Sequence, residues 1–212
     1  MAIPDRLRLE FPLKLLALTI LLAGCGATGK APPSSSAGAA DKRALITVPA
    51  NGAAKLTVTT PAFTDGSDIP FENTQYKGNT FPGLSWSAGP AGTMSYVIIL
   101  QDVDARPRGS TEPYLHWTMG NIPASVTTLD AGMTTLPAGS LYGPNYRGAN
   151  QPYAGPRTPP GPKHHYHFQV FALDSVLSAE AFASYEALLG AMKGHVVASG
   201  EVVGLGQVMP AG

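Results

Sequence analysis

The chain has 212 residues, of which 44% are hydrophobic, and its 14 basic and 14 acidic side chains give a formal net charge of zero. This length fits one domain with additional segments, or at most two small domains, and the apolar content is sufficient for a buried core. The balanced charge excludes the basic field that nucleic-acid binding requires, and no polybasic run in the sequence marks a surface for anionic lipid headgroups.

The first residues have the layout of a secretory signal. Arg6, Arg8 and Lys14 precede an apolar run over residues 15–23, which is short for a helix that spans a membrane. The sequence Leu22-Ala23-Gly24-Cys25 then looks like a lipobox, at which the signal is removed and the cysteine thiol receives a lipid. The alternative is a plain secretory signal followed by an incidental cysteine.

Cys25 is the single cysteine of the chain, so lipidation would leave the mature domain without a thiol. Two or more acyl chains, such as palmitate, are enough for stable anchoring in a membrane. Gly26 follows it, and the absence of aspartate at this position fits sorting to an outer membrane in a cell that has one. We therefore expect residues 1–24 to be a lipoprotein signal peptide and the chain to be anchored in the bacterial cell envelope, on the periplasmic face of the outer membrane.

The segment after the lipobox is expected to be a tether. Residues 26–43 have no periodicity and no large apolar groups, so they cannot offset the entropy cost of becoming ordered. We expect residues 25–54 to comprise the lipid-anchored cysteine and a flexible tether, in which Ala44 to Val48 is predicted as a short extra strand. The folded domain is then expected over residues 55–209.

The domain is predicted to be mostly β. The chain contains 24 glycines and 20 prolines, which favours a turn-rich β protein. Leu56–Thr60 is β-branched and is bounded by a proline, whereas Ser95–Asp102 is a nearly continuous apolar run of the kind found in the middle of a sandwich. Leu115–Ile122 and Tyr166–Leu173 repeat this character, and Val196–Val203 is predicted as the final strand.

One helix is predicted near the C-terminus. Ser184 is a suitable N-cap, Glu186 suits the first turn, and Gly194 can close the helix as a left-handed residue. The apolar side chains between them fall at the spacing i, i+3, i+4 and i+7 of one helical face: Tyr185, Leu188, Leu189 and Met192. The sequence therefore predicts a single mostly-β domain with a few short helices.

Polar residues concentrate at strand ends in three places, the first of which runs from Asp102 to Pro107. Because side chains alternate along a strand, Asp102 and Asp104 share a face wherever the strand stays extended. Aspartate and proline are also ordinary turn residues, so a plain turn is the alternative.

The second place is the segment Tyr114 to Pro123. Alternation puts His116 and Thr118 on one face and Leu115, Trp117 and Met119 on the other. A lone histidine at the start of a strand is more often a structural residue than a ligand.

The third place is a proline-rich loop from Gly155 that leads into a strand dense in imidazoles. Alternation directs His164 and Tyr166 one way and His165 and His167 the other. One strand therefore presents only two of these histidines to one ion. His165 with His167 is the candidate metal pair, weighed against a solvated face, and we predict neither a metal nor a cofactor.

These segments, taken in order over about 150 residues, resemble the phosphatidylethanolamine-binding protein family, in its bacterial Raf-kinase-inhibitor-like branch. Each motif is weak alone, but the ordered set is strong. Besides the three segments above, the matching motifs are Pro61-Ala62-Phe63, Ile69-Pro70, Leu84-Ser85-Trp86-Ser87, Pro90-Ala91-Gly92-Thr93, Phe171-Ala172-Leu173-Asp174 and Ala191-Met192-Lys193-Gly194-His195.

The resemblance implies an antiparallel β-sandwich with a small cavity lined by strand ends. The residues that it places in this cavity are Asp102, Asp104, His116, Gly155, Pro156, His164 and Tyr166. The chain departs from the family pattern at His165, where an arginine is usual, and in the Tyr76-Lys77-Gly78 region, where a cysteine is often found.

The resemblance implies binding of a small anion, such as a phosphate or a phospholipid headgroup, without catalysis. Two imidazoles and the Tyr166 hydroxyl would supply donors, and Asp102 would orient and charge His116 or His164, so that affinity rises as the pH falls through the histidine range. The sequence has no Gly-x-Ser-x-Gly elbow and no phosphate-binding glycine loop followed by Lys-Ser/Thr.

Two other functions are compatible with the resemblance. The first is inhibition of a protein kinase or a serine protease, with a target that the sequence does not identify. The second is metal-dependent hydrolysis, because Asp102, His116 and His164 are common types of zinc ligand, although no compact metal motif such as His-Glu-x-x-His occurs.

Overall fold

The computed structural model describes residues 41–208, which form two antiparallel β-sheets with a few short helices. The expected signal peptide and the lipidation at Cys25 lie outside the described residues. The strands are β1 (Val58–Thr59), β2 (Leu84–Trp86), β3 (Ser95–Asp102), β4 (Tyr114–Pro123), β5 (Thr128–Leu129), β6 (Leu141–Tyr142), β7 (His164–Leu173) and β8 (Val196–Gly206). The helices are α1 (Ala44–Thr47), η1 (Phe71–Asn73), η2 (Ala179–Phe182) and α2 (Tyr185–Met192), of which η1 and η2 are 3-10 helices.

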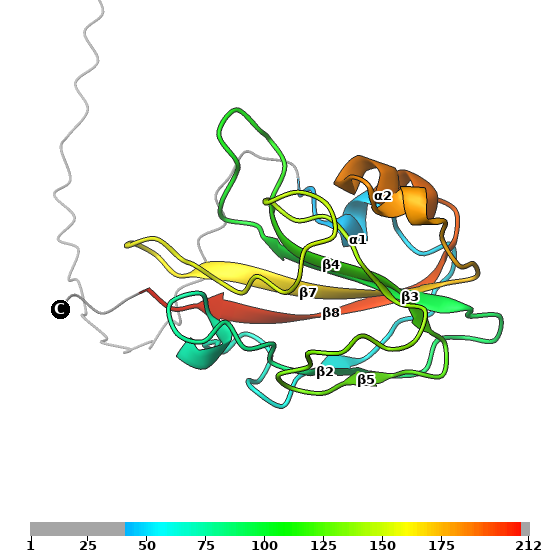
Figure 1. The fold of residues 1–212 in the computed structure, drawn as a ribbon, viewed down its shortest axis with the longest axis horizontal. Helices are drawn as coiled ribbons and strands as arrows, with labels where there is room; N and C mark the ends of the chain where they lie inside the picture. Colours follow the sequence, from blue (N-terminus) through cyan, green and yellow to red (C-terminus); the bar gives the residue numbers. More distant parts are fainter. Residues whose placement is uncertain (1–40, 209–212) are drawn as a thin grey trace, which may run out of the picture. The chain divides into compact units, whose positions relative to one another are not determined.

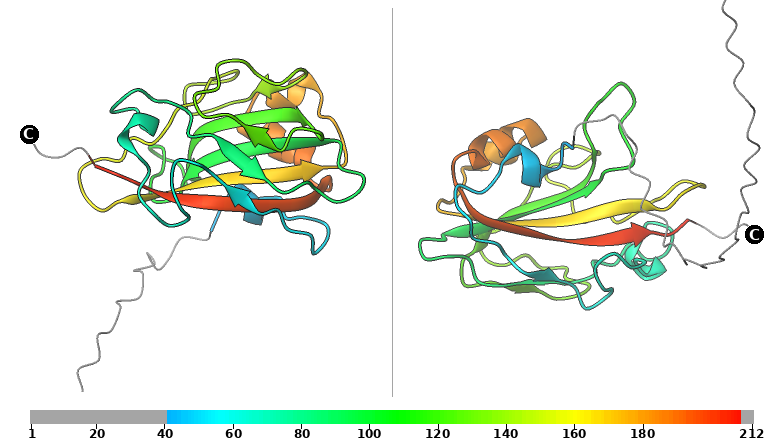
Figure 2. Two further views of the ribbon diagram at one scale, coloured as in Figure 1. Left: turned by 90° about the horizontal axis from the view of Figure 1, so that it is seen from below. Right: turned by 180° about the vertical axis from the view of Figure 1, so that it is seen from behind.

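The elements form three layers (Figures 1 and 2). The larger sheet has the order β6-β4-β3-β7-β8, and the smaller sheet has the order β1-β2-β5. The small sheet covers one face of the large sheet, while α1 and α2 lie on the opposite face. The predicted mostly-β sandwich with a helix near the C-terminus is therefore confirmed.

The core consists of two apolar clusters, one on each face of the large sheet. Tyr96, Ile98 and Leu100 of β3 belong to the inner cluster between the sheets, whereas Val97 and Ile99 belong to the outer cluster under the helices. All eight residues of β3 are buried. A strand covered on both faces needs apolar side chains at every position, which explains the continuous apolar run in the sequence.

The helix predicted near the C-terminus is confirmed as α2. The Ser184 hydroxyl accepts a hydrogen bond of 3.1 Å from the Ala187 backbone N–H, as an N-cap does. Leu188 and Met192 are fully buried, and Gly194 has a positive φ of 84° just after the helix. Local sequence signals therefore set both ends of this helix.

The predicted strand at Ala44–Val48 is wrong, because Ala44–Thr47 forms the short helix α1. Its first N–H groups have no partner within the helix and are accepted by two buried side chains. The Ala44 N–H donates to Gln101 Oε1 and the Leu45 N–H donates to Gln169 Oε1, each over 2.9 Å. Gln101 and Gln169 lie on the large sheet, in β3 and β7, and are fully buried.

This docking also corrects the expected extent of the tether. Ala44 and Val48 are buried in the outer cluster, and Arg43 forms a 2.6 Å ion pair with Glu201 of β8. These residues pack as part of the folded domain, which therefore begins before residue 55.

Strand β4 contains an irregularity that affects His116. Leu100 of β3 pairs with Trp117, but the next residue, Gln101, pairs with Leu115, so His116 is an extra residue in a β-bulge. Leu115 accordingly belongs to the outer cluster and Trp117 to the inner one. The prediction that these two side chains share a face is wrong, because the bulge interrupts the alternation.

Candidate functional site

The candidate site lies at the end of the large sheet where β3 finishes and β7 begins. Asp102 is the last residue of β3 and pairs with Tyr166 of β7 and Tyr114 of β4. Its Oδ1 accepts the backbone N–H groups of Asp104 (2.9 Å) and Ala105 (3.0 Å), which closes a turn. The segment therefore forms the turn that its composition suggests, at the edge of the candidate site.

Asp104 does not join Asp102 on one face. The strand ends at Asp102, and the Asp104 carboxylate instead accepts the backbone N–H and the ring Nδ1 of His165, over 2.7 and 2.8 Å. This side chain is 35% exposed, compared with 3% for that of Asp102. The two aspartates are expected to share a face only where the strand stays extended, and this condition is not met because the turn begins at Asp102.

Asp102 orients His164 directly. Its Oδ2 lies 2.8 Å from Nδ1 of His164. Because a carboxylate is an acceptor, this contact places a proton on Nδ1 of His164. The Asp102 carboxylate thus accepts three N–H groups and keeps the imidazole in one orientation.

His116 is fixed from the opposite side by two backbone carbonyls. Its Nδ1 lies 3.0 Å from the Gly155 oxygen and 3.2 Å from the Ala154 oxygen. Carbonyl oxygens only accept, so Nδ1 carries a proton in every state that keeps these bonds. In the neutral ring, Nε2 is then a lone-pair acceptor, and it becomes a donor only when the ring is protonated.

Burial lowers the pKa of His116, and Asp102 partly opposes this shift. Burial disfavours the charged ring, whereas the nearby carboxylate and the two carbonyls favour it. The positive charge of Arg147 also lowers the pKa of His116, as the smallest of these effects. The negative charge of Asp102 therefore acts on His116 through space, while its hydrogen bond goes to His164.

Tyr166 packs edge-on against His116, with ring centroids 5.1 Å apart and an angle of 74° between the rings. Its hydroxyl accepts the Arg157 backbone N–H over 3.2 Å and lies 3.3 Å from Thr158 Oγ1. Burial raises the pKa of the Tyr166 phenol, and the Asp102 charge adds to this. The phenol therefore stays neutral at physiological pH.

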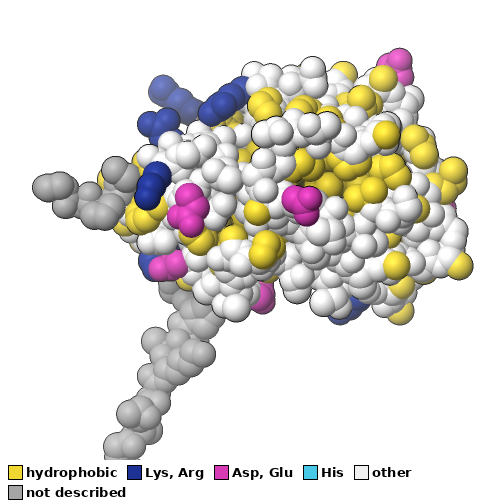
Figure 3. Space-filling view, turned by 60° about the horizontal axis from the view of Figure 1, so that its bottom comes forward, with side chains coloured by type: hydrophobic (Ala, Val, Ile, Leu, Met, Phe, Trp, Pro, Cys, Tyr) yellow, Lys and Arg dark blue, Asp and Glu magenta, His cyan; other side chains and the backbone are white. Residues whose placement is uncertain are grey.

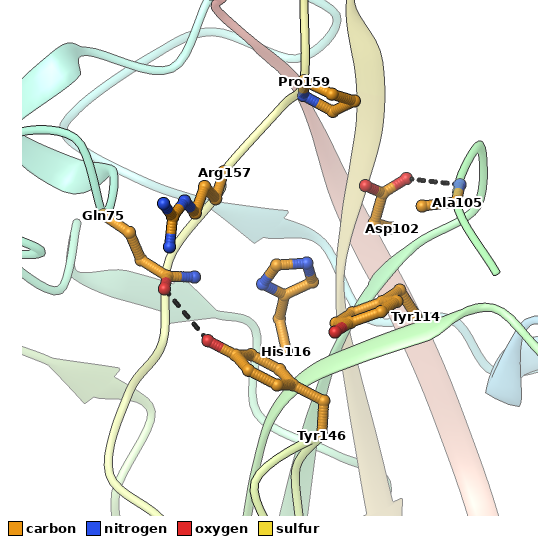
Figure 4. A pocket seen from close by; sticks show the side chains of 8 residues that line it. All are labelled: Gln75, Asp102, Ala105, Tyr114, His116, Tyr146, Arg157 and Pro159. Atoms are coloured by element: carbon orange, nitrogen blue, oxygen red, sulfur yellow. Dashed lines mark hydrogen bonds between the residues drawn. The ribbon is translucent and has the colours of Figure 1, made fainter. Parts of the chain in front are cut away.

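These residues border an open cavity of about 300 Å³ (Figure 4). His116 lies between the loop that carries Arg157 and the strand end that carries Asp102. The cavity is lined by Gln75, Asp102, Ala105, Tyr114, His116, Tyr146, Arg157 and Pro159. A cation, a carboxylate, an imidazole and two phenol rings thus face one small space.

The sequence prediction identified part of this lining. Asp102 and His116 face the cavity, while His164 and Tyr166 contact these two residues from behind. Gly155 contributes the carbonyl that holds His116, and the Pro156 carbonyl accepts the Gln75 N–H over 2.9 Å. Asp104 is absent from the lining.

Sequence reasoning missed Gln75, which links three parts of the wall. Its Nε2 donates to the Gly155 carbonyl over 2.6 Å, so this oxygen accepts from both Gln75 and His116. Its Oε1 accepts from the Tyr146 hydroxyl over 2.9 Å and from Arg147 Nη2 over 3.0 Å. No pattern in the sequence connects these distant residues.

Two other missed residues adjoin predicted ones. Tyr114 lies two positions before His116, and Arg157 directly follows the Gly155-Pro156 pair. Arg157 could have been found as the nearest cation to a predicted anion-binding loop. Tyr114 was missed because alternation along a strand, taken alone, does not show where a cavity opens.

The candidate metal pair is not assembled. His165 bonds to Asp104, whereas Nδ1 of His167 lies 2.9 Å from Glu201. Within residues 41–208, no three His, Cys, Asp or Glu side chains gather closely enough to hold a metal ion.

The family model for phosphatidylethanolamine-binding protein matches residues 59–207 of the chain. A UPF0098 protein of Methanothermobacter thermautotrophicus is 39% identical over 155 residues, which cover 71% of this chain and 97% of that protein. YbcL of Escherichia coli, also a UPF0098 protein, is 42% identical over 135 residues, or 59% of this chain and 70% of its own length.

Two solved structures are similar to this fold. CT736 of Chlamydia trachomatis, at 33% identity, aligns with a TM-score of 0.63 and covers 71% of this chain and 96% of that one. The crystal structure of E. coli YbcL, at 27% identity, aligns with a TM-score of 0.65 and covers 74% of this chain and all of that one (100%).

One relative bears on localisation. A Mycobacterium tuberculosis protein named "Putative lipoprotein LppC" is 37% identical over 170 residues, 76% of this chain and 78% of its own. Among the helices of residues 41–208, none has the length and apolar character needed to cross a bilayer.

Proposed function

Because this chain belongs to the phosphatidylethanolamine-binding protein family, we propose that its cavity binds a small anionic group, such as the phosphate of a phospholipid headgroup, without catalysing a reaction. The ligand would be held by protonated His116, by Arg157 and by the hydroxyl of Tyr114. Hydrogen bonds from charged donors to phosphate oxygens are the strong ones, and a guanidinium can form two at once.

One observation supports this function most. The carbonyls of Ala154 and Gly155 occupy Nδ1 of His116, so the ring has a single nitrogen left for a ligand. When protonated, this nitrogen becomes a donor in a largely buried position, where a charge-assisted hydrogen bond is worth more than in water. A bound anion would lie beside the Asp102 carboxylate. The repulsion between them is reduced because Asp102 already accepts three N–H groups within the protein.

Within the described part of the chain, the wall of the cavity has no aliphatic hydroxyl or thiol of the kind that a neighbouring histidine activates, which supports binding without chemistry. The eight lining residues of the cavity, all within residues 41–208, include no serine, threonine or cysteine. The two buried phenols of the neighbourhood, Tyr153 and Tyr166, are made poorer nucleophiles by burial, which raises the pKa of each.

Calorimetric titration with O-phosphorylethanolamine at slightly acidic pH tests this function. The wild-type chain is expected to bind one equivalent, and His116→Gln is expected to weaken binding about 10- to 100-fold, as the loss of a charged hydrogen bond does. The matched control is His195→Gln, because His195 is an exposed histidine paired with Asp174; it should change the affinity less than twofold. Equal binding by all three chains would refute the proposed site.

We further propose that the chain is anchored in the cell envelope through a lipid on Cys25. The lipobox Leu22–Cys25 and the resemblance to a relative named as a lipoprotein support this. Cells expressing the wild-type chain are expected to incorporate labelled palmitate into it and to retain it with the membranes. Cys25→Ser should abolish both, and label that persists on the Cys25→Ser chain would contradict anchoring at this residue.

A further inference from the structure

Three arginines from three separate loops lie in the lining of the cavity or next to it in the chain. Arg106 follows the lining residue Ala105, Arg147 follows the lining residue Tyr146, and Arg157 lines the cavity itself. Arg147 and Arg157 are exposed, and Arg106 is half-buried. We refer to Arg106, Arg147 and Arg157 as the rim arginines.

Two of the rim arginines are held in place by the walls of the cavity. The Arg147 guanidinium lies 5.0 Å from the centre of the Tyr146 ring, over its face, and donates to Gln75. Arg106 Nη1 donates to the carbonyls of Val103 (2.5 Å) and Ala105 (2.8 Å). These contacts keep the cations at the opening with donors still free for a further anion.

The rim arginines are not neutralised by the acidic side chains around them. Asp102 is buried against His164, Asp104 pairs with His165, and Glu112 pairs with Lys42 over 2.6 Å. Within residues 41–208, none of the rim arginines has an ion pair with a carboxylate. Three cations without a carboxylate partner within these residues thus lie at one end of the large sheet, although the whole chain has a net charge of zero.

The space-filling view shows where the cations lie. In Figure 3, most of the visible lysine and arginine side chains gather at the left-hand end of the molecule, where some acidic side chains also lie. No pattern in the sequence indicates this surface, because the rim arginines are far apart along the chain and form no polybasic run. The fold brings them together around one opening.

We propose that the rim arginines dock the domain onto an anionic lipid surface, with the cavity facing the headgroups. The orientation of the cavity rests on the proposed binding of a headgroup, whereas the docking itself does not. A headgroup in a bilayer is surrounded by the phosphates of neighbouring lipids, so a headgroup in the cavity places those phosphates against the rim. Guanidinium groups pair well with phosphates, and cations near an anionic bilayer are attracted to it.

A lipid surface fits the rim better than a protein partner does. The cations are spread over three loops around one opening, which matches a lateral array of phosphates rather than one phosphorylated side chain. The proposed anchor also favours this partner, because Asp41 lies sixteen positions after Cys25. A chain of that length spans at most about 55 Å, so the domain would stay near the bilayer at high effective concentration.

Vesicle adsorption of the chain from residue 25 onward, carrying Cys25→Ser so that it cannot be acylated there, tests the docking without the expected signal peptide. Phosphatidylcholine vesicles with and without phosphatidylglycerol are used in saturating glycerophosphorylethanolamine, a soluble diester that competes with the lipid phosphates for the cavity. We expect stronger adsorption to the anionic vesicles and its loss at high salt. Each arginine near the surface should contribute about a fivefold factor, so Arg147→Gln with Arg157→Gln should weaken adsorption roughly 20-fold.

A matched control separates the rim from total charge. Lys55→Gln with Lys193→Gln removes two exposed charges toward the opposite end of the large sheet, near Ser199 and Val196, and should weaken adsorption less than twofold. Because the soluble diester competes for the cavity throughout, a failure of headgroup binding cannot imitate a failure of docking. The proposal would be overturned if the two double variants lost adsorption equally, or if adsorption did not depend on phosphatidylglycerol. Displacement from the vesicles by a trace of soluble phosphoprotein would assign the rim to a protein partner instead.

Discussion

The affinity for a phosphate diester is expected to fall about tenfold for each unit by which the pH rises across the titration of His116. Nδ1 of His116 is committed to two carbonyls, so a proton must be added at Nε2 before the ring can donate to the ligand. Burial lowers the pKa of this ring in the free protein, and a bound anion raises it. At a pH between the pKa of His116 in the free protein and its pKa in the complex, the complex holds one proton more than the free protein, so affinity decreases with rising pH. Below the pKa of His116 in the free protein, the affinity becomes independent of pH.

Calorimetry with glycerophosphorylethanolamine measures this dependence. A diester keeps one negative charge throughout, whereas a phosphate monoester takes up its own second proton with a pKa near 6 and would obscure the result. Titrations in buffers of different ionisation enthalpy should report the uptake of nearly one proton on binding. His116→Gln should remove both the proton uptake on binding and the dependence of the affinity on pH. An affinity that is flat with pH, or a release of protons, would contradict the proposed mode of binding.

Gly155→Ala is expected to destabilise the domain by about 1–3 kcal/mol, as overpacking of a filled site does, and to weaken binding more than tenfold. A Cβ at this position would lie 2.2 Å from the Asn73 carbonyl oxygen and 2.9 Å from the Tyr153 hydroxyl. The loop must move to relieve these contacts. That movement displaces the carbonyl that holds both His116 and Gln75.

The same substitution at Gly190 provides a control of opposite sign. Gly190 lies inside α2, and a Cβ there would have no neighbouring atom within 4 Å. Gly190→Ala should therefore stabilise the domain by up to about 1 kcal/mol, because alanine favours the helix over glycine. Urea unfolding measures both changes, and the titration above measures binding. If Gly155→Ala retained the wild-type stability and affinity, the role of this loop would be disproved.

Much of the fold follows from local patterns in the sequence. The run Ser95–Asp102 predicted a strand covered on both faces, and Ser184 and Gly194 marked the ends of α2, as the structure confirms. The alternation after His164 also predicted correctly that His164 and Tyr166 point one way while His165 and His167 point the other. Each of these features depends on neighbours within one element.

The errors arise where contacts between distant segments decide the conformation. The bulge at His116 exists because β4 adjusts its register against β3, and no alternation pattern reveals such an extra residue. Helix α1 forms where Gln101 and Gln169 offer acceptors to its first N–H groups. Gln75 likewise reaches the cavity only through contacts with residues more than seventy positions away.

The most direct test of the central claim is nitrogen-15 NMR of the His116 ring during titration with glycerophosphorylethanolamine near neutral pH. In the free protein, Nδ1 should carry the proton and Nε2 should show the shift of an unprotonated nitrogen. In the saturated complex, both ring nitrogens should show shifts of protonated nitrogen. A saturated complex in which Nε2 of His116 stays unprotonated would contradict the account.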